Sequence, residues 1–269
     1  ADARQWAEWG FDYAKYDWGI DSAEVARRMA EALAACDRVI VLELSNSVPL
    51  NLAAECVAHG QLTRTTGDLI DLWDRSQMDE GTRKWAVGIR EVMLEHDAYA
   101  PFQRPGHWNH ACNLRVGLLG GWRDKPLTPS RLTPDEQYSH ISLWCLWGSP
   151  MIIGTPIERL DEFTLGLLTN DEVLEVNQDP LGMQAVRAAL PGGGEALCKA
   201  MEDGSRAVGL FNPGAEAATV AATWADLGVA GPQRVRDLWR QKDLGVFTGG
   251  FSARVAPHGV VMIRLFAAE

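Results

Sequence analysis

Short apolar runs alternate with helical patterns along the first 190 residues of the chain. Phe11 to Tyr16 and Arg38 to Leu44 are predicted strands, and Asp21 to Leu33 is a predicted helix between them. Further helices are predicted over about 50–58, 69–73 and 80–95, and further strands near 62–64 and 105–109 and over 151–153. Strand-helix units of this length predict a parallel sheet, and five in succession fit part of a (β/α)8 barrel, roughly its strands 4–8.

The segment Thr133-Pro134-Asp135-Glu136 carries the clearest helix start. Threonine suits the N-cap, proline suits the first helical position, and a glutamate three residues after the cap closes a capping box. We therefore predict a helix that runs from this segment to about Trp147.

The pattern changes near Leu190, where a Pro-Gly-Gly-Gly run follows. Beyond it, short alternating apolar runs are separated by Gly, Pro and Asn, which is typical of antiparallel strands. We predict two domains: a partial TIM-barrel domain over 1–190 and an antiparallel β domain, a small sandwich, over 191–269.

Composition narrows the function classes. A formal net charge of −11 argues against nucleic-acid and anionic-membrane partners, which select for an excess of Lys and Arg. The five cysteines are widely spread and lack CxxC pairing, so neither a disulfide framework nor a zinc ribbon is indicated. Eleven tryptophans lean weakly towards a carbohydrate ligand, although core packing explains them equally well.

Lys15 and Asp17 lie two residues apart near the end of the first predicted strand, so both side chains should point the same way. We expect this strand to be buried, and burying such a pair costs several kcal/mol in order-of-magnitude terms. A structural ion pair and a catalytic site are both open interpretations of the pair.

Other chemically active residues also follow predicted strands, where a β/α barrel places its reactive groups. Two carboxylates facing one cavity suit glycoside hydrolysis, one as nucleophile and one as acid. Asp17 and Asp68 fit these roles, while a helix N-cap is the alternative for Asp68. The candidates at the second, third and fourth strand ends are Glu43, Ser45 and Asn46, then Arg64 and Asp68, then His107, Trp108, Asn109 and His110.

Five ordered segments, together with a C-terminal tail, resemble the signature blocks of glycoside hydrolase family 27, the α-galactosidase or melibiase family. The segments are WGFDYAKYDWG (9–19), LTRTTGDLIDLW (62–73), RPGHWN (104–109), LTPDEQYSHISLWCLWGSPMIIG (132–154) and LTNDEVLEVNQDPLGMQ (168–184). The resemblance covers nearly the whole chain and implies a barrel followed by an antiparallel β domain.

The resemblance implies a retaining mechanism with Asp17 as nucleophile and Asp68 as acid/base. Lys15 and Arg64 would bind sugar hydroxyls, and Ser45 and Asn46 occupy the position that reads the substituent beside the anomeric carbon. The other implied substrate-binding residues are Glu43, Trp108 and Asn113. Family hydrolysis implies no cofactor and no metal. Cleavage of terminal α-D-galactosyl residues is the leading expectation, with α-N-acetylgalactosaminidase, β-L-arabinopyranosidase and isomalto-dextranase as alternatives.

One block departs from the family pattern. The usual Trp-Asn-Asp-Pro-Asp-Met-Leu appears here as WNHACNL (108–114), which replaces two acids and a methionine. That loop normally lines the sugar site, so the substrate could differ from plain α-galactose. His107, His110 and Cys112 have residue types that suit a metal. Gly19 stands where many relatives carry a disulfide cysteine.

The family pattern also includes three strands before the one that contains Asp17. We therefore expect a longer gene product, a companion segment, or a second copy of the chain as partner, because an open barrel exposes sheet edges. A carbohydrate-binding remnant without turnover is the alternative to an enzyme. Secretion or a periplasmic location is expected from the family alone.

Overall fold

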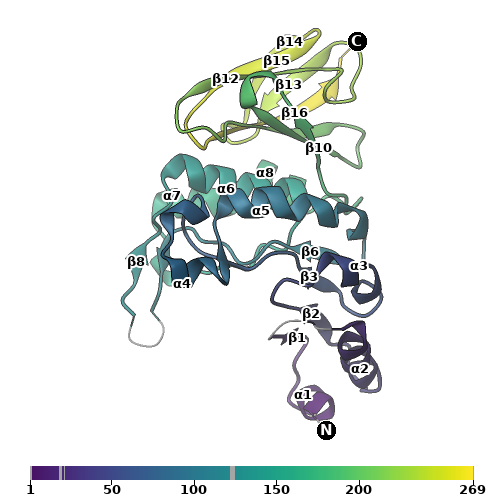
Figure 1. Cartoon of the computed structure of the whole chain (residues 1–269). Coiled ribbons are helices and arrows are strands. Elements are labelled where there is room, and N and C mark those ends of the chain that lie inside the picture. The colour runs from purple at the N-terminus through teal and green to yellow at the C-terminus, as the bar shows by residue number, and fades with distance from the viewer. Residues whose placement is uncertain (1, 18–19, 21, 122–124, 269) are drawn as a thin grey trace.

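The computed structural model describes residues 2–17, 20, 22–121 and 125–268. The end of the YAKYDWG motif, including Gly19, lies outside these residues, as does Asp21 of the predicted helix start. The chain runs from an α/β part at the N-terminus through a helical layer to a β domain at the C-terminus (Figure 1).

The α/β part contains a parallel sheet of four strands in the order β1-β2-β3-β6. Helix α2 (Ala23–Ala34) connects β1 to β2, and α3 (Leu50–Cys56) connects β2 to β3. The strands are β1 (Tyr13–Tyr16), β2 (Val41–Leu44), β3 (Leu62–Arg64) and β6 (Trp108–His110), and α1 (Asp2–Glu8) precedes them. Parallel strands joined by helices confirm the predicted partial barrel.

Two parts of the predicted pattern are wrong in detail. The segment 151–153 is not a strand, so the described residues hold four parallel barrel strands rather than five; Ile152 O accepts one hydrogen bond from Leu114 N at 2.8 Å. The segment 69–73, predicted as a helix, begins instead with β4 (Asp68–Leu69), which pairs in parallel with β5 (Ala86–Val87).

The predicted helix over 80–95 is interrupted by β5. Its two pieces are α4 (Glu80–Arg83) and α5 (Ile89–Glu95). Gly88 is the N-cap of the second piece, and a Cβ there would lie 2.7 Å from the backbone oxygen of Trp73. The close approach of the two backbone segments requires glycine at this point. The helical periodicity used for the prediction does not reveal such a contact.

Helix α6 (Pro134–Trp147) confirms the capping-box prediction. Thr133 Oγ1 accepts from Glu136 N at 3.3 Å, and Glu136 Oε2 accepts from Thr133 N at 2.8 Å. Eleven of the fourteen residues are buried, because α6 packs against α8 (Asp171–Asn177) on one side and the β domain on another. Figure 1 shows this helical layer between the β domain and the parallel sheet.

The C-terminal domain is an antiparallel sandwich, as predicted, and its first strand, β9, lies before the predicted boundary at 190. Its larger sheet has the order β14-β13-β16-β11-β10-β9, and β12 pairs with β15 in a smaller sheet. A buried cluster that includes Val208, Val220 and Ile263 joins the two sheets. The strands are β9 (Val186–Ala189), β10 (Glu195–Ala200), β11 (Arg206–Phe211), β12 (Ala218–Thr223), β13 (Gln233–Asp237), β14 (Lys242–Phe247), β15 (Gly250–Val255) and β16 (Val260–Ala267).

The remaining elements are short connections. They are α7 (Glu162–Thr169), the hairpin of β7 (Leu118–Leu119) and β8 (Thr128–Pro129), and the 3-10 turns η1 (Arg75–Gln77), η2 (His96–Phe102), η3 (Ile157–Arg159) and η4 (Pro191–Gly193). All five cysteines are free thiols. Within the described ranges, no helix has both the length and the apolar character that a membrane crossing requires.

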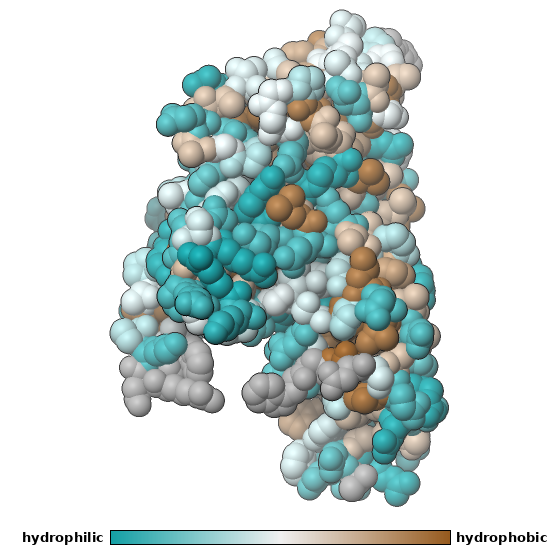
Figure 2. Space-filling view, in the orientation of Figure 1, coloured by the Kyte–Doolittle hydropathy of each residue, from teal (hydrophilic) through white to brown (hydrophobic). Residues whose placement is uncertain are grey.

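Hydrophobic surface is unevenly distributed. The face over α4 is hydrophilic and one hydrophobic spot interrupts the face over α5, whereas more hydrophobic residues gather lower down, over the region of α3 and β2 (Figure 2). Phe11 and Tyr13 near β1 are 51% and 39% exposed. They belong to the edge of the parallel sheet, where β1 has β2 as its only paired strand among the described residues.

The capping box of α6 is open to a stability test. Thr133→Ala removes the side-chain acceptor for Glu136 N and should lower the free energy of unfolding by about 1 kcal/mol, measured by urea denaturation. Thr248→Ala, at an exposed turn of the β domain, serves as the matched control. Equal stability of the two variants would contradict the assigned cap.

Candidate active site

Parallel pairing aligns polar residues on one face of the sheet. Lys15 of β1 lies opposite Glu43 of β2, and Arg64 of β3 lies opposite His110 of β6. Asp17 follows β1 directly and lies two residues beyond Lys15. Because alternate strand residues share a face, this register brings the candidate residues together at the carboxyl ends of the strands.

A cavity of about 320 Å³ lies at these strand ends. It is lined by five of the residues predicted to act on or bind the substrate, namely Lys15, Glu43, Arg64, Asp68 and Asn113, by the strand-end candidate His110, and by Cys112, Arg115 and Ile152. The mixture of cationic and anionic groups around one small cavity suits a polar, hydroxyl-rich ligand.

Asp17 lies at the border of this group rather than in its lining. Its Oδ1 is 3.9 Å from Lys15 Nζ, so the two side chains point the same way, as predicted. The expected burial is wrong, because the Lys15 and Asp17 side chains are 44% and 53% exposed. β1 is an edge strand, and an edge strand with one neighbour leaves part of its surface uncovered.

Arg64 connects the third strand to Asp68. Its side chain is 3% exposed, and Nη2 donates to Asp68 Oδ1 at 3.2 Å and to Gly67 O at 2.9 Å. Asp68 begins strand β4 and is 44% exposed, so it is not the helix N-cap considered as its alternative. Arg64 therefore fixes the loop that presents this carboxylate to the cavity.

Glu43 is a buried carboxylate held by two neutral donors. Tyr13 donates its hydroxyl to Oε2, and His110 Nδ1 lies 2.5 Å from Oε1. Burial acts to raise the pKa of Glu43, but the hydrogen bonds from His110 and Tyr13 and the nearby charges outweigh it, so the pKa is lowered. Burial lowers the pKa of His110. The pair is thus a carboxylate and a neutral imidazole with its proton on Nδ1.

The other predicted residues differ in position. Ser45 is fully buried after β2, Asn46 is half-buried with a positive φ of 62°, and Asn113 Oδ1 accepts from Cys112 Sγ at 3.1 Å. Trp108 lies apart from this group: it begins β6 and lines a separate cavity of about 510 Å³ with Leu62.

The three residues considered as metal ligands do not converge. His107 Nε2 lies 2.8 Å from Thr63 Oγ1 and its Nδ1 lies 3.1 Å from Phe102 O, whereas His110 faces Glu43. In the part of the chain that the structure describes, no group of three or more His, Cys, Asp or Glu residues is arranged to hold a metal ion.

His110, Tyr13 and Arg115 are site residues that the sequence analysis did not assign to substrate. The available signal for His110 was its position at the end of the fourth predicted strand. His110 of β6 pairs with Glu43 of β2, although β3 lies between these two strands. A contact between strands that are not neighbours cannot be predicted from the local sequence.

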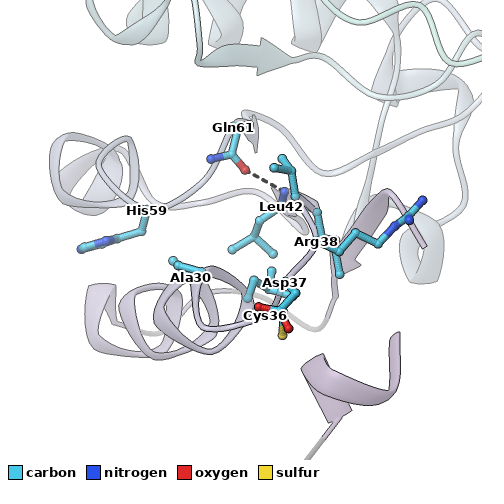
Figure 3. A pocket seen from close by; sticks show the side chains of 11 residues that line it. Ala30, Cys36, Asp37, Arg38, Leu42, His59 and Gln61 are labelled. Atoms are coloured by element: carbon cyan, nitrogen blue, oxygen red, sulfur yellow. Dashed lines mark hydrogen bonds between the residues drawn. The ribbon is translucent and has the colours of Figure 1, made fainter. Parts of the chain in front are cut away.

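A further cavity, of about 290 Å³, lies between α2 and the start of β2 (Figure 3). There Gln61 points to the backbone of Leu42, whose N–H donates to Gln61 Oε1 at 2.8 Å. Asp37 and Arg38 precede β2, so this cavity is at the amino end of the strand. None of the predicted site residues lines it.

Comparison with known proteins agrees with this architecture. A family model described as alpha galactosidase A matches residues 1–179, and a model of the alpha galactosidase C-terminal beta sandwich domain matches 191–265. Alpha-galactosidase 2 of Arabidopsis thaliana is 32% identical over 270 residues, covering 98% of this chain and 62% of that protein.

Solved structures show the same similarity. A family 27 β-L-arabinopyranosidase from Geobacillus stearothermophilus has a TM-score of 0.88 at 28% identity, covering 99% of this chain and 60% of the other. Alpha-galactosidase I from Mortierella vinacea has a TM-score of 0.84 at 26% identity, covering 99% and 70%.

The fold and the position of the site define a β/α-barrel protein with a C-terminal β sandwich. The chain belongs to glycoside hydrolase family 27, the melibiase family. It spans 59–65% of the length of the curated relatives compared first.

Buried histidines predict how stability depends on pH. Burial lowers the pKa of His96 to about 3, of His107 to about 4 and of His140 to about 3. In the unfolded chain these groups titrate near 6.5. Between about pH 6.5 and 4 the unfolded state binds more protons, so the free energy of unfolding should fall as pH falls.

His107→Asn should reduce this fall between pH 7.5 and 5.0 by up to about 2 kcal/mol, since asparagine does not titrate. Urea denaturation at the two pH values measures it, with the exposed Gln5→Asn as control. An unchanged pH dependence in His107→Asn would contradict the assigned burial of a neutral His107.

Proposed function

We propose that the protein is a retaining glycoside hydrolase in which Asp17 is the nucleophile and Asp68 the acid/base. The observation that carries this proposal is the convergence of Lys15, Arg64 and Asp68 on one cavity, with Asp17 3.9 Å from Lys15. Family membership supports it independently.

In the first step, the Asp17 carboxylate attacks the anomeric carbon while Asp68 donates its proton to the departing glycosidic oxygen. This forms a glycosyl ester on Asp17 and releases the aglycone. In the second step Asp68 takes a proton from water, which attacks the same carbon and breaks the ester bond. Two inversions retain the anomeric configuration.

The neighbouring cations Lys15 and Arg64 bind the sugar and orient the acid/base carboxyl. Lys15 Nζ is a hydrogen-bond donor for sugar hydroxyls beside the nucleophile. Arg64 holds Asp68 at 3.2 Å, which keeps the acid/base carboxyl directed towards the cavity.

The substrate we propose is a terminal α-D-galactosyl group. Curated relatives at 31–32% identity are named alpha-galactosidases. The small polar residues Ser45 and Asn46 would lie beside the anomeric carbon of this sugar.

A β-L-arabinopyranoside is the second candidate substrate. It is supported by the TM-score of 0.88 to a β-L-arabinopyranosidase and by the altered block over 109–114. This sugar shares the ring stereochemistry of galactose but lacks the hydroxymethyl group. Comparing kcat/KM for the two aryl glycosides decides between them.

Carboxamide variants test the catalytic roles in the complete protein that carries this chain. Asp17→Asn should abolish hydrolysis of aryl α-galactosides, because the amide is a poor nucleophile. Asp68→Asn should lower kcat by roughly 10²- to 10⁴-fold on substrates with poor leaving groups and by less on activated ones, since only the former need the acid. Initial rates with an aryl leaving-group series measure both effects.

Glu216→Gln, at an exposed position of the β domain, is the matched control and should hydrolyse like the parent. Undiminished cleavage by Asp17→Asn would refute its role as nucleophile. A parent protein that binds galactose but hydrolyses none of the aryl glycosides would favour the carbohydrate-binding alternative.

A further inference from the structure

Three neighbouring residues at the carboxyl ends of the strands each leave one buried polar atom unpaired. Ser45, Arg64 and His110 are 0%, 2% and 3% exposed. Ser45 Oγ, Arg64 Nε and His110 Nε2 have no hydrogen-bond partner among the residues described. Buried polar groups are nearly always paired, so three unpaired atoms from adjacent strands point to a ligand group.

The sheet register places these residues in one row. Arg64 and His110 are paired across β3 and β6. Leu44 pairs with Thr63, so Ser45, the next residue after β2, lies beside Arg64. Arg64 and His110 also line the site cavity. Two of the three residues in the row therefore border the proposed active site, and Ser45 continues the row behind them.

The three atoms differ in hydrogen-bonding character. Arg64 Nε–H is a donor, and a serine hydroxyl both donates and accepts. His110 donates from Nδ1 to the Glu43 carboxylate, so Nε2 carries a lone pair and is an acceptor. A single hydroxyl group, which donates one hydrogen bond and accepts others, satisfies this set.

The surroundings favour the neutral form of His110. Lys15 of β1 and Arg64 of β3 are cations beside it, and Glu43 of β2 is the carboxylate that faces it, with His96 of η2 nearby. Burial and the two cations lower the pKa of His110 and outweigh Glu43, which raises it. Nε2 consequently remains an acceptor at neutral pH.

We propose that His110 is a specificity-determining residue whose Nε2 accepts a hydrogen bond from one hydroxyl of the bound sugar, with Glu43 as the positioning residue that fixes its ring. This inference rests on the proposed glycosidase function and adds a contact to it. The three atoms are shielded from bulk solvent, and two of the residues that carry them, Arg64 and His110, border the site cavity.

Two substitutions of His110 separate the ligand contact from the Glu43 contact. In His110→Asn, the amide replaces the Nδ1 side of the ring and keeps a donor for Glu43 but removes the acceptor. In His110→Gln, the longer side chain returns an acceptor near the Nε2 position. Ser45→Ala deletes one oxygen from the same row and perturbs packing little.

The experiment measures kcat and KM in the complete protein for aryl α-galactoside and for its 2-, 3-, 4- and 6-deoxy analogues. We expect His110→Asn to lower kcat/KM on the parent sugar by roughly 10- to 100-fold. One monodeoxy analogue lacks the hydroxyl that donates to His110 Nε2, and on that analogue His110→Asn should not lower kcat/KM further. His110→Gln should recover part of the activity that His110→Asn loses. Ser45→Ala should lower kcat/KM on the parent sugar, and should cause no further loss on the same deoxy analogue.

Calorimetry measures the binding of free galactose to Asp17→Asn and to the double variant Asp17→Asn/His110→Asn. This comparison distinguishes failure of the His110 proposal from failure of the proposed glycosidase function. If the unsubstituted protein hydrolyses galactosides but Asp17→Asn binds galactose equally well with and without His110→Asn, the role of His110 is overturned. The glycosidase function would still stand. A loss of kcat/KM in His110→Asn that is the same for every deoxy analogue would mean that an ordered water alone occupies the row, and would also overturn it. A parent that neither binds nor hydrolyses galactosides would refute the proposed function itself. His59→Asn, on the distant α2 cavity, is the control with unchanged activity.

Discussion

The burial of helix α6 between two layers is the constraint on which the rest of the structure depends. Its aromatic residues Trp144 and Trp147 are fully buried in a core cluster that extends from Leu69 of β4 to Met262 of β16. The helix also reaches the site: Trp144 Nε1 donates to Cys112 O at 2.7 Å, and His140 Nε2 accepts from Arg115 N at 3.0 Å. One helix therefore holds the β domain and the loop that lines the cavity in a single packed unit.

The opposite side of the site depends on the edge strand β1, which carries both Lys15 and the proposed nucleophile. Backbone pairing to β2 holds it on one side, and the Tyr13–Glu43–His110 chain of hydrogen bonds ties it across the face of the sheet. Removing either neutral donor would leave a buried carboxylate with one hydrogen bond fewer, which costs stability. The same carboxylate orients His110, so strand position and ring orientation are coupled through Glu43.

Elements with local signals were predictable from the sequence. The cap at Thr133 and the β/α alternation depend on neighbours along the chain, and the fold class followed from them. Features that depend on distant partners were not predictable. Strand β4 replaces a predicted helix because it pairs with β5, and Lys15 is exposed because the edge of β1 has no second neighbour in the described residues. Trp108 begins its strand, so it lines a different cavity from Arg64.

The central claim is that Asp17 becomes covalently bonded to the sugar. Its most direct test is to incubate the complete protein with a fluorinated galactosyl fluoride that glycosylates a retaining enzyme quickly and is released slowly. Mass spectrometry of the digested protein should then locate one added fluorosugar on the peptide that contains Asp17. A label on another carboxylate, or turnover of the reagent with no trapped ester, would contradict the account.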